Sequence, residues 1–261
     1  MNPLPILSAP PAPVIVVANL RHAFGGVWRL TFRRFLLPSR WLTVMVGLVV
    51  LTLLSFAFAR GASTGHYVNW LGTFYVTFLV PSLAFIAAAG AMRDEMKSST
   101  VDYVLTRPLP RPAFVIFKFI AHTACAQIDF FLALMVVLVV GHLRGLAGLA
   151  AAAPQLLVGQ VLLVLAASAF GFLCAILTSR YIVLGLAYAG IVEAGLGQIP
   201  TQLSRLSLTR QIRDLLDPAS GIVSAGATLG TAGFILVFTG VALAAAAAVF
   251  HMRELAAPAE S

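Results

Sequence analysis

Six apolar stretches, each long enough to cross a lipid bilayer, limit what this 261-residue chain can fold into. About twenty mainly apolar residues form one helical crossing, because hydrocarbon offers backbone N–H and C=O groups no partner outside their own segment. The chain is 60% hydrophobic and only 10% charged. We therefore predict an all-α integral membrane protein with six transmembrane helices, at Trp41–Ala59, Trp70–Met92, Phe119–Gly141, Gln155–Ser179, Tyr181–Ile199 and Thr228–Phe250.

The Lys and Arg residues predict how these spans are oriented. If both termini are cytoplasmic, twelve basic residues fall in cytoplasmic segments and five in outer ones. Basic residues are enriched on the cytoplasmic side of a membrane, so we expect a multi-pass protein of the cell (cytoplasmic or inner) membrane with both termini inside. The net charge of +8 is then better explained by topology and attraction to anionic lipid than by binding of nucleic acid.

The N-terminal region divides into two parts. Its first seventeen residues contain five prolines and are predicted to form a flexible cytoplasmic tail, as is the C-terminal segment 251–261. Residues 18–40 follow as an amphipathic helix that ends at Pro38 and is predicted to lie in the membrane interface, apolar side toward lipid. The alternative is a loosely held basic segment. The apolar arc comprises Leu20, Phe24, Val27, Trp28, Thr31 and Phe35.

A polar segment, Arg93–Lys118, separates the second apolar stretch from the third. Such a segment has to lie in water, and Met92–Leu105 has the pattern of a short helix. Three prolines at positions 108, 110 and 112 would end that helix and stiffen the return to the membrane. The segment is therefore predicted to be a rigid element able to transmit a push.

Six residues of this segment resemble a family pattern. They follow the order and spacing of the cytoplasmic coupling loop in permease subunits of type-2 ABC exporters, with Ser99 where glycine is usual and Lys97 where a second acid is common: Glu95, Thr100, Leu105, Pro108, Arg111 and Lys118.

The resemblance implies a coupling loop over residues 92–112 and a homodimer or paired permease, each subunit docking on a separate ATP-binding cassette subunit. The alternative is a charged loop without a partner. The residues expected to couple to the ATPase are Arg93, Glu95, Thr100, Leu105, Pro108, Arg111 and Lys118, the last reaching the cytoplasmic interface.

No energy-converting motif is found in the sequence itself. A phosphate-binding loop ends in GK[ST], but the lysines of this chain, Lys97 and Lys118, follow Met96 and Phe117. No familiar enzyme motif is present either, so we expect a transport subunit that is not an enzyme, binds no cofactor and uses ATP through its partner. Cys125, Cys174 and the scattered histidines lack metal-ligand spacing, which predicts no metal site.

Polar residues inside the spans are further candidates, because they are costly there and usually face protein or water. Lys118, His122, Cys125 and Asp129 share one stripe of the third span, and Glu193 is the buried acid of the fifth. These acids could line a substrate path or relay protons, or could fix packing against neighbouring helices. Glycines at 190, 195 and 197, followed by Pro200, indicate that the fifth helix breaks nearby.

An outer helix is predicted over 201–217, with Leu208, Ile212, Leu215 and Leu216 on one side. We expect it to lie on the outer membrane surface or dip into it. It would then either gate an exit or serve as a passive surface helix.

The sequence as a whole favours an ATP-driven exporter permease. A proton- or ion-coupled carrier using Asp129 and Glu193 and a non-transporting membrane scaffold remain as alternatives. Lipid, polysaccharide, peptide and small hydrophobic compounds all stay open as cargo.

Overall fold

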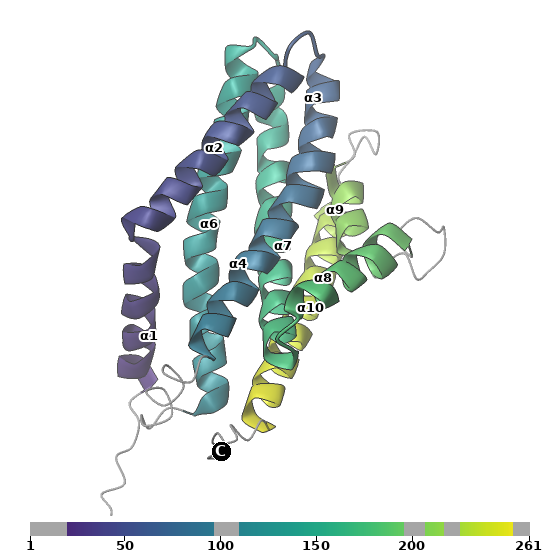
Figure 1. Cartoon of the computed structure of the whole chain (residues 1–261). Helices are drawn as coiled ribbons and strands as arrows, with labels where there is room; N and C mark the ends of the chain where they lie inside the picture. Colours follow the sequence, from purple (N-terminus) through teal and green to yellow (C-terminus); the bar gives the residue numbers. More distant parts are fainter. Residues whose placement is uncertain (1–19, 97–109, 196–206, 217–224, 253–261) are drawn as a thin grey trace, which may run out of the picture.

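The computed structural model of the protein describes residues 20–96, 110–195, 207–216 and 225–252, and all its regular elements there are helical (Figure 1). The predicted coupling residues Thr100, Leu105 and Pro108 lie outside the described residues. In chain order the elements are α1 (Leu20–Phe35), α2 (Pro38–Phe58), α3 (Thr64–Trp70), the π-helix η1 (Leu71–Leu79), α4 (Val80–Glu95), α6 (Arg111–Leu143), α7 (Leu149–Leu177), α8 (Tyr181–Tyr188), the π-helix η2 (Ala189–Gly195), α9 (Leu208–Leu216) and α10 (Ala225–Met252).

Five helical segments of the described chain are long and apolar enough to span a membrane. They coincide with five of the six predicted spans. The second span is continuous through α3, η1 and α4, and it extends past the predicted end at Met92 to Glu95. The five segments are Pro38–Phe58, Thr64–Glu95, Arg111–Leu143, Leu149–Leu177 and Leu229–Met252.

The predicted fifth span is the exception. Over Tyr181–Ile199 the described chain holds only a shorter apolar helix, Tyr181–Glu193, formed by α8 and part of η2. A helix of this length rises about 20 Å, less than the roughly 30 Å of a hydrocarbon core. Within the described residues this region thus holds a helical element shorter than a full span, and Figure 1 shows it leaning away from the bundle.

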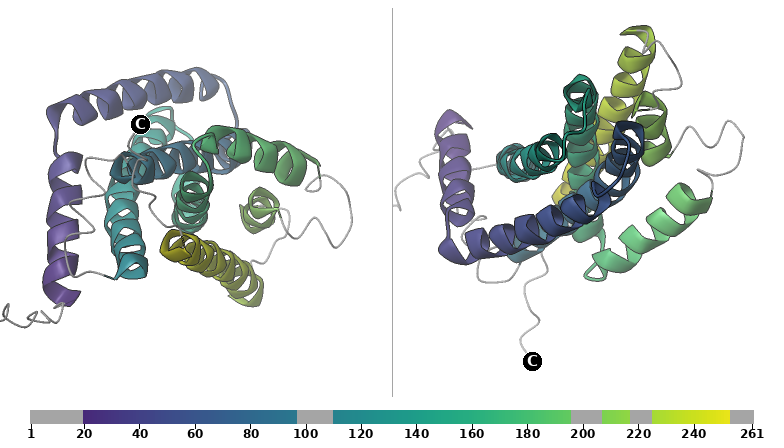
Figure 2. Two further views of the ribbon diagram at one scale, coloured as in Figure 1. Left: turned by 60° about the horizontal axis from the view of Figure 1, so that its bottom comes forward. Right: turned by 90° about the horizontal axis from the view of Figure 1, so that it is seen from above.

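Helix α7 lies at the centre of the bundle, packed against α4, α10 and α6 (Figures 1 and 2). Small residues allow the close approach of α4 and α7, as is typical of helix pairs in membranes. At Gly171 a Cβ atom would lie only 2.7 Å from the carbonyl oxygen of Phe85 and 3.2 Å from the amide nitrogen of Ala89. The position therefore has no room for any side chain.

Helix α1 packs along α6 rather than standing free. Thr31 and Phe35 of its apolar arc are buried, and Phe24 makes an edge-on ring contact with Phe117 at 5.3 Å. Most of this arc therefore packs on the apolar surface of α6, while Leu20 is exposed; the interfacial position of the helix stays a prediction. Leu30 and Phe32, which flank the arc on α1, are exposed as well.

Pro38 separates α1 from α2, as the sequence predicted. It occupies the first turn of α2, where its missing N–H costs no hydrogen bond. Helix α2 leaves α1 in a new direction, and in the described part of the chain it packs mainly on α6 (Figure 2). Its other side chains, such as Leu42, Val46 and Leu53, are exposed and apolar.

Four helix ends gather at one end of the bundle, at the bottom of Figure 1. They are the start of α1, the end of α4, the start of α6 and the end of α10. The described residues that flank segment 97–109, within the polar segment Arg93–Lys118, therefore lie at the same end of the bundle as the start of α1 and the end of α10.

We predict that Gly171→Ala destabilises the protein while Gly240→Ala does not. The added methyl at 171 would meet backbone atoms of α4 and force α4 and α7 apart, at a cost of about 1–3 kcal/mol. Gly240 is a matched control in a helix, since a Cβ there has nothing within 4 Å. Thermal unfolding in detergent, followed by tryptophan fluorescence, measures the difference. Equal melting temperatures for both variants would contradict this packing.

Candidate functional site

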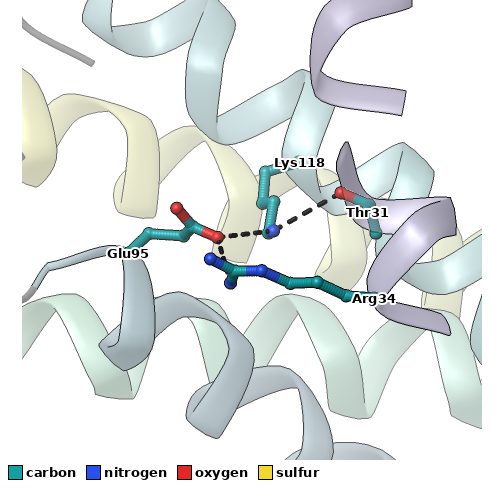
Figure 3. Close-up of polar contacts among 4 residues, drawn as sticks. All are labelled: Thr31, Arg34, Glu95 and Lys118. Carbon is teal, nitrogen blue, oxygen red and sulfur yellow. Dashed lines mark hydrogen bonds and ion pairs between the residues drawn. The ribbon is translucent and has the colours of Figure 1, made fainter. Parts of the chain in front are cut away.

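A buried cluster of charged and polar side chains, hereafter the Glu95 cluster, joins three helices beside the polar segment 97–109. It comprises Thr31 and Arg34 of α1, Glu95 of α4 and Lys118 of α6. Glu95 Oε1 accepts hydrogen bonds from Arg34 Nη1 at 2.7 Å and from Lys118 Nζ at 2.9 Å (Figure 3). Lys118 Nζ also lies 3.4 Å from the hydroxyl of Thr31.

Burial makes the cluster unusual for a membrane bundle of low charge. The side chains of Glu95 and Lys118 are only 2% and 3% exposed, while that of Arg34 is 44% exposed. A buried ion is costly unless its partner and hydrogen bonds are in place, so Glu95 and Lys118 depend on one another. Arg34 is partly hydrated and adds less, because solvent screens its charge.

The local structure explains how these residues meet. Thr31 and Arg34 are three residues apart on α1 and therefore on neighbouring positions of one face. Glu95 is the last residue of α4, and Lys118 lies two turns into α6. The packing of α1 on α6 brings these faces together. The charges thus join the helix entering the polar segment to the helix leaving it.

The predicted coupling residues are placed in different ways. The side chains of Glu95 and Lys118 are buried, so they are not available for direct contact with another protein. Lys118 was expected to reach the cytoplasmic interface, but it does not reach the protein surface. Arg93 Nη1 lies 3.4 Å from the carbonyl oxygen of Ala175 in α7. Arg111 is half-buried at the start of α6.

Asp129 forms a separate ion pair that links α2 with α6. Its Oδ2 accepts a hydrogen bond from Arg40 Nη2 at 2.7 Å, and the Arg40 guanidinium also lies 4.5 Å from the ring centre of Phe35. Oδ1 of Asp129 is buried without a hydrogen-bond partner among the described residues. The contact favours the packing role for Asp129 over the proton-relay role.

His122 lies on the same stripe of α6 as Lys118 and Asp129, as predicted. It is buried, its ring centre is 5.9 Å from that of Phe172, and its Nε2 has no hydrogen-bond partner in the described structure. In the described ranges of the chain there is no group of three His, Cys, Asp or Glu side chains that could hold a metal ion. A functional role for His122 stays a prediction.

Glu193 lies elsewhere, in η2, where its carboxylate binds the start of α9. The two acids proposed for a carrier therefore have different partners on different helices. Sequence reasoning missed Arg34 and Arg40 as the partners of Glu95 and Asp129. Their only signal was position: each is a basic residue at the membrane-facing end of the N-terminal region, beside an otherwise apolar stretch.

We predict a strong coupling between Glu95 and Lys118 in a double-mutant cycle of stability. Glu95→Gln leaves Lys118 as a buried ion without its counter-charge and should cost about 3–5 kcal/mol. Lys118→Met leaves Glu95 paired with Arg34 and should cost less. The double variant should recover part of the loss, because it removes both buried charges. Additive losses in thermal or denaturant unfolding would show that the pair is not coupled.

Comparison with known families agrees with this architecture. The family model described as "ABC-2 family transporter protein" matches residues 34–191, more than half of the chain, from Arg34 at the end of α1 to the helix that follows α7. No curated protein matches the chain. The matched region contains Glu95, Lys118, Arg40 and Asp129 and four of the five long apolar helices. The chain therefore belongs to the ABC-2 family of transporter proteins and is a multi-pass membrane permease of an ABC transporter.

Proposed function

We propose that this permease works as an exporter and is coupled through residues 92–112 to a separate ATP-binding cassette subunit. The observation that carries the proposal is the Glu95–Lys118 ion pair, which joins the two helices on either side of segment 97–109. A partner that pushes on this segment would act on α4 and α6 at once. The sequence pattern with Thr100, Leu105, Pro108 and Arg111 supplies the surface on which the partner would dock.

The Glu95 cluster supports a mechanical route for the coupling. Helix α6 and the continuous helical segment α4–η1–α3 both run from the cluster to the opposite end of the bundle (Figure 1). Arg34 adds α1, which is connected through Pro38 to α2. Because Glu95 and Lys118 are costly to separate, a displacement of the segment would move α1, α4 and α6 together. ATP would be bound and hydrolysed by the partner, and this chain would need no cofactor of its own.

We further propose that two permeases pair in the cell membrane with both termini on the cytoplasmic side. The placement of the first and last helices at the same end as segment 97–109 supports this topology. The largely exposed apolar surface of α2 supports contact with lipid or a second permease, since Leu51 and Ser55 are the buried residues of this helix. Nucleic acid is not a proposed partner.

The two alternatives to this function gain little support. A proton- or ion-coupled carrier would require Asp129 and Glu193 to act along one path, but Asp129 pairs with Arg40 and Glu193 binds the start of α9. A non-transporting scaffold would give no reason to join both flanks of segment 97–109 by a buried ion pair. The family membership also favours a permease of an ABC transporter over both.

Co-purification tests the docking. The tagged full-length chain, isolated in mild detergent from the cells that produce it, should retain an ATPase that contains a phosphate-binding loop. Replacing residues 100–105 by a Gly-Ser repeat should release the ATPase, because the proposed contact surface is lost. The same replacement of residues 201–206 serves as a control and should leave the ATPase bound.

Two results would count against the proposal. An ATPase still bound after replacement of residues 100–105 would show that docking occurs elsewhere. A folded wild-type chain that retains no ATPase in its own cells would contradict the coupled permease itself. Thermal unfolding of each variant confirms that any loss of binding is not a loss of folding.

A further inference from the structure

Helix α9 packs against the bundle with one side and exposes the other. Its apolar residues Leu208, Ile212 and Leu215 are buried, and it packs against η1, α7 and α10. Figure 1 shows it beside the upper half of α10. The apolar side of the predicted outer helix therefore contacts protein, and the position of this helix relative to the membrane stays a prediction.

Two glycines make room for this helix. A Cβ atom at Gly159 of α7 would lie 3.2 Å from Ile212, and one at Gly72 of η1 would lie 3.5 Å from Leu216. The same Cβ at Gly159 would lie 3.6 Å from Val76. Helix α9 thus fits as a wedge into a shallow glycine-lined seat formed by η1 and α7.

The carboxylate of Glu193 binds the N-terminus of α9. Glu193 of η2 accepts hydrogen bonds from the backbone N–H groups of Leu208 and Thr209, at 3.1 and 3.2 Å, and from the Ser207 hydroxyl at 2.6 Å. The hydroxyl of Thr209 and that of Tyr188, at 2.9 Å, donate to it as well. Glu193 therefore satisfies two N–H groups in the first turn of α9 that have no partner within the helix.

The contact between the Glu193 carboxylate and the start of α9 is strong and local. Hydrogen bonds to a charged acceptor are stronger than those between neutral groups, and a negative charge at a helix N-terminus is stabilised by the helix dipole. Ser207 completes the cap, because its hydroxyl accepts a hydrogen bond from the N–H of Arg210 at 3.1 Å. By contrast, α8, which precedes Glu193, has no buried residue of its own. It contacts the bundle at Gly185, where a Cβ atom would lie 2.5 Å from the Phe85 ring, and through Tyr188, whose ring centre is 4.6 Å from that of Phe170.

We propose that Glu193 is a latch that holds α9 in its seat and that α9 leaves the seat as a unit when this latch opens. Gly159 and Val76, which line the seat near Ile212, are the sequence neighbours of Gln160 and Tyr75. These two form a buried polar pair, in which Tyr75 Oη lies 2.8 Å from Gln160 Oε1. Nε2 of Gln160 is buried without a hydrogen-bond partner among the described residues. Because Tyr75 Oη also donates a hydrogen bond to the carbonyl oxygen of Phe130 in α6 at 3.0 Å, this polar pair lies behind the seat, where η1 and α7 meet α6.

The latch itself does not depend on the proposed function, but its meaning for transport does. In an exporter, a wedge that opens one end of the bundle would gate the route of release. Glu193 would then be a positioning residue, which acts through α9 and does not need to contact the cargo.

Cysteine accessibility tests the latch. In the purified full chain in lipid nanodiscs, with both native cysteines changed to alanine, Ile212→Cys reports whether α9 is seated. A water-soluble maleimide should label it slowly in the parent protein and roughly tenfold faster or more after Glu193→Ala, since several charge-assisted hydrogen bonds are lost together. Tyr188→Phe is the matched control: it removes one donor to Glu193 but leaves the cap of α9, so labelling should stay slow.

Two further reporters separate latch opening from unfolding. Arg213→Cys, on the exposed side of α9, should react rapidly with and without Glu193. Ala88→Cys, buried between α4 and its neighbours, should stay protected in both. Slow labelling of Ile212→Cys in a folded Glu193→Ala protein would overturn the latch. Equally fast labelling of Ala88→Cys and Ile212→Cys in the Glu193→Ala protein would also overturn it, because it would indicate general unfolding. Because no ATPase is used, this outcome is independent of the co-purification result.

Discussion

A backbone N–H or C=O without a partner costs several kcal/mol in hydrocarbon, and most features of this structure follow from that constraint. The long helices satisfy it internally over their whole length. The short helix α9 also begins with N–H groups that have no partner within the helix and need acceptors. The carboxylate of Glu193 and the hydroxyl of Ser207 provide them. A costly acid within an apolar region is thus explained by the backbone groups it satisfies.

The same constraint explains why the few buried charges lie where helices must be tied together. Glu95 and Lys118 are almost fully buried and joined at 2.9 Å, whereas Arg34 and Arg40 are partly exposed. A buried ion pair adds little net stability, but breaking it is expensive, so it allows one arrangement and penalises others. This property suits a junction that has to transmit a displacement. The large apolar core around α7 also stabilises the bundle, but apolar contacts are not directional and do not select one arrangement of the helices in this way.

Much of the fold could be predicted from local patterns. Apolar length identified five spanning helices, and Pro38 correctly separated α1 from α2. The remaining differences arise where a helix has a choice of neighbours. The apolar arc of α1 could pack on lipid or on α6, and both surfaces suit it equally on a helical wheel. Apolar composition likewise could not distinguish the shorter helix Tyr181–Glu193, which is all that the described residues show of the predicted fifth span, from a full-length one.

The sequence alone determined the membrane character of the protein, the positions of its long helices and the motif that resembles a coupling loop. These features depend on residues close together in the chain. The sequence also identified Glu95, Lys118, Asp129 and Glu193 as unusual. Only the tertiary structure decided their partners: Arg34 is 61 residues from Glu95, and Arg40 is 89 residues from Asp129. Charge pairing over such separations depends on how helices pack, and packing among apolar surfaces leaves no local trace in the sequence.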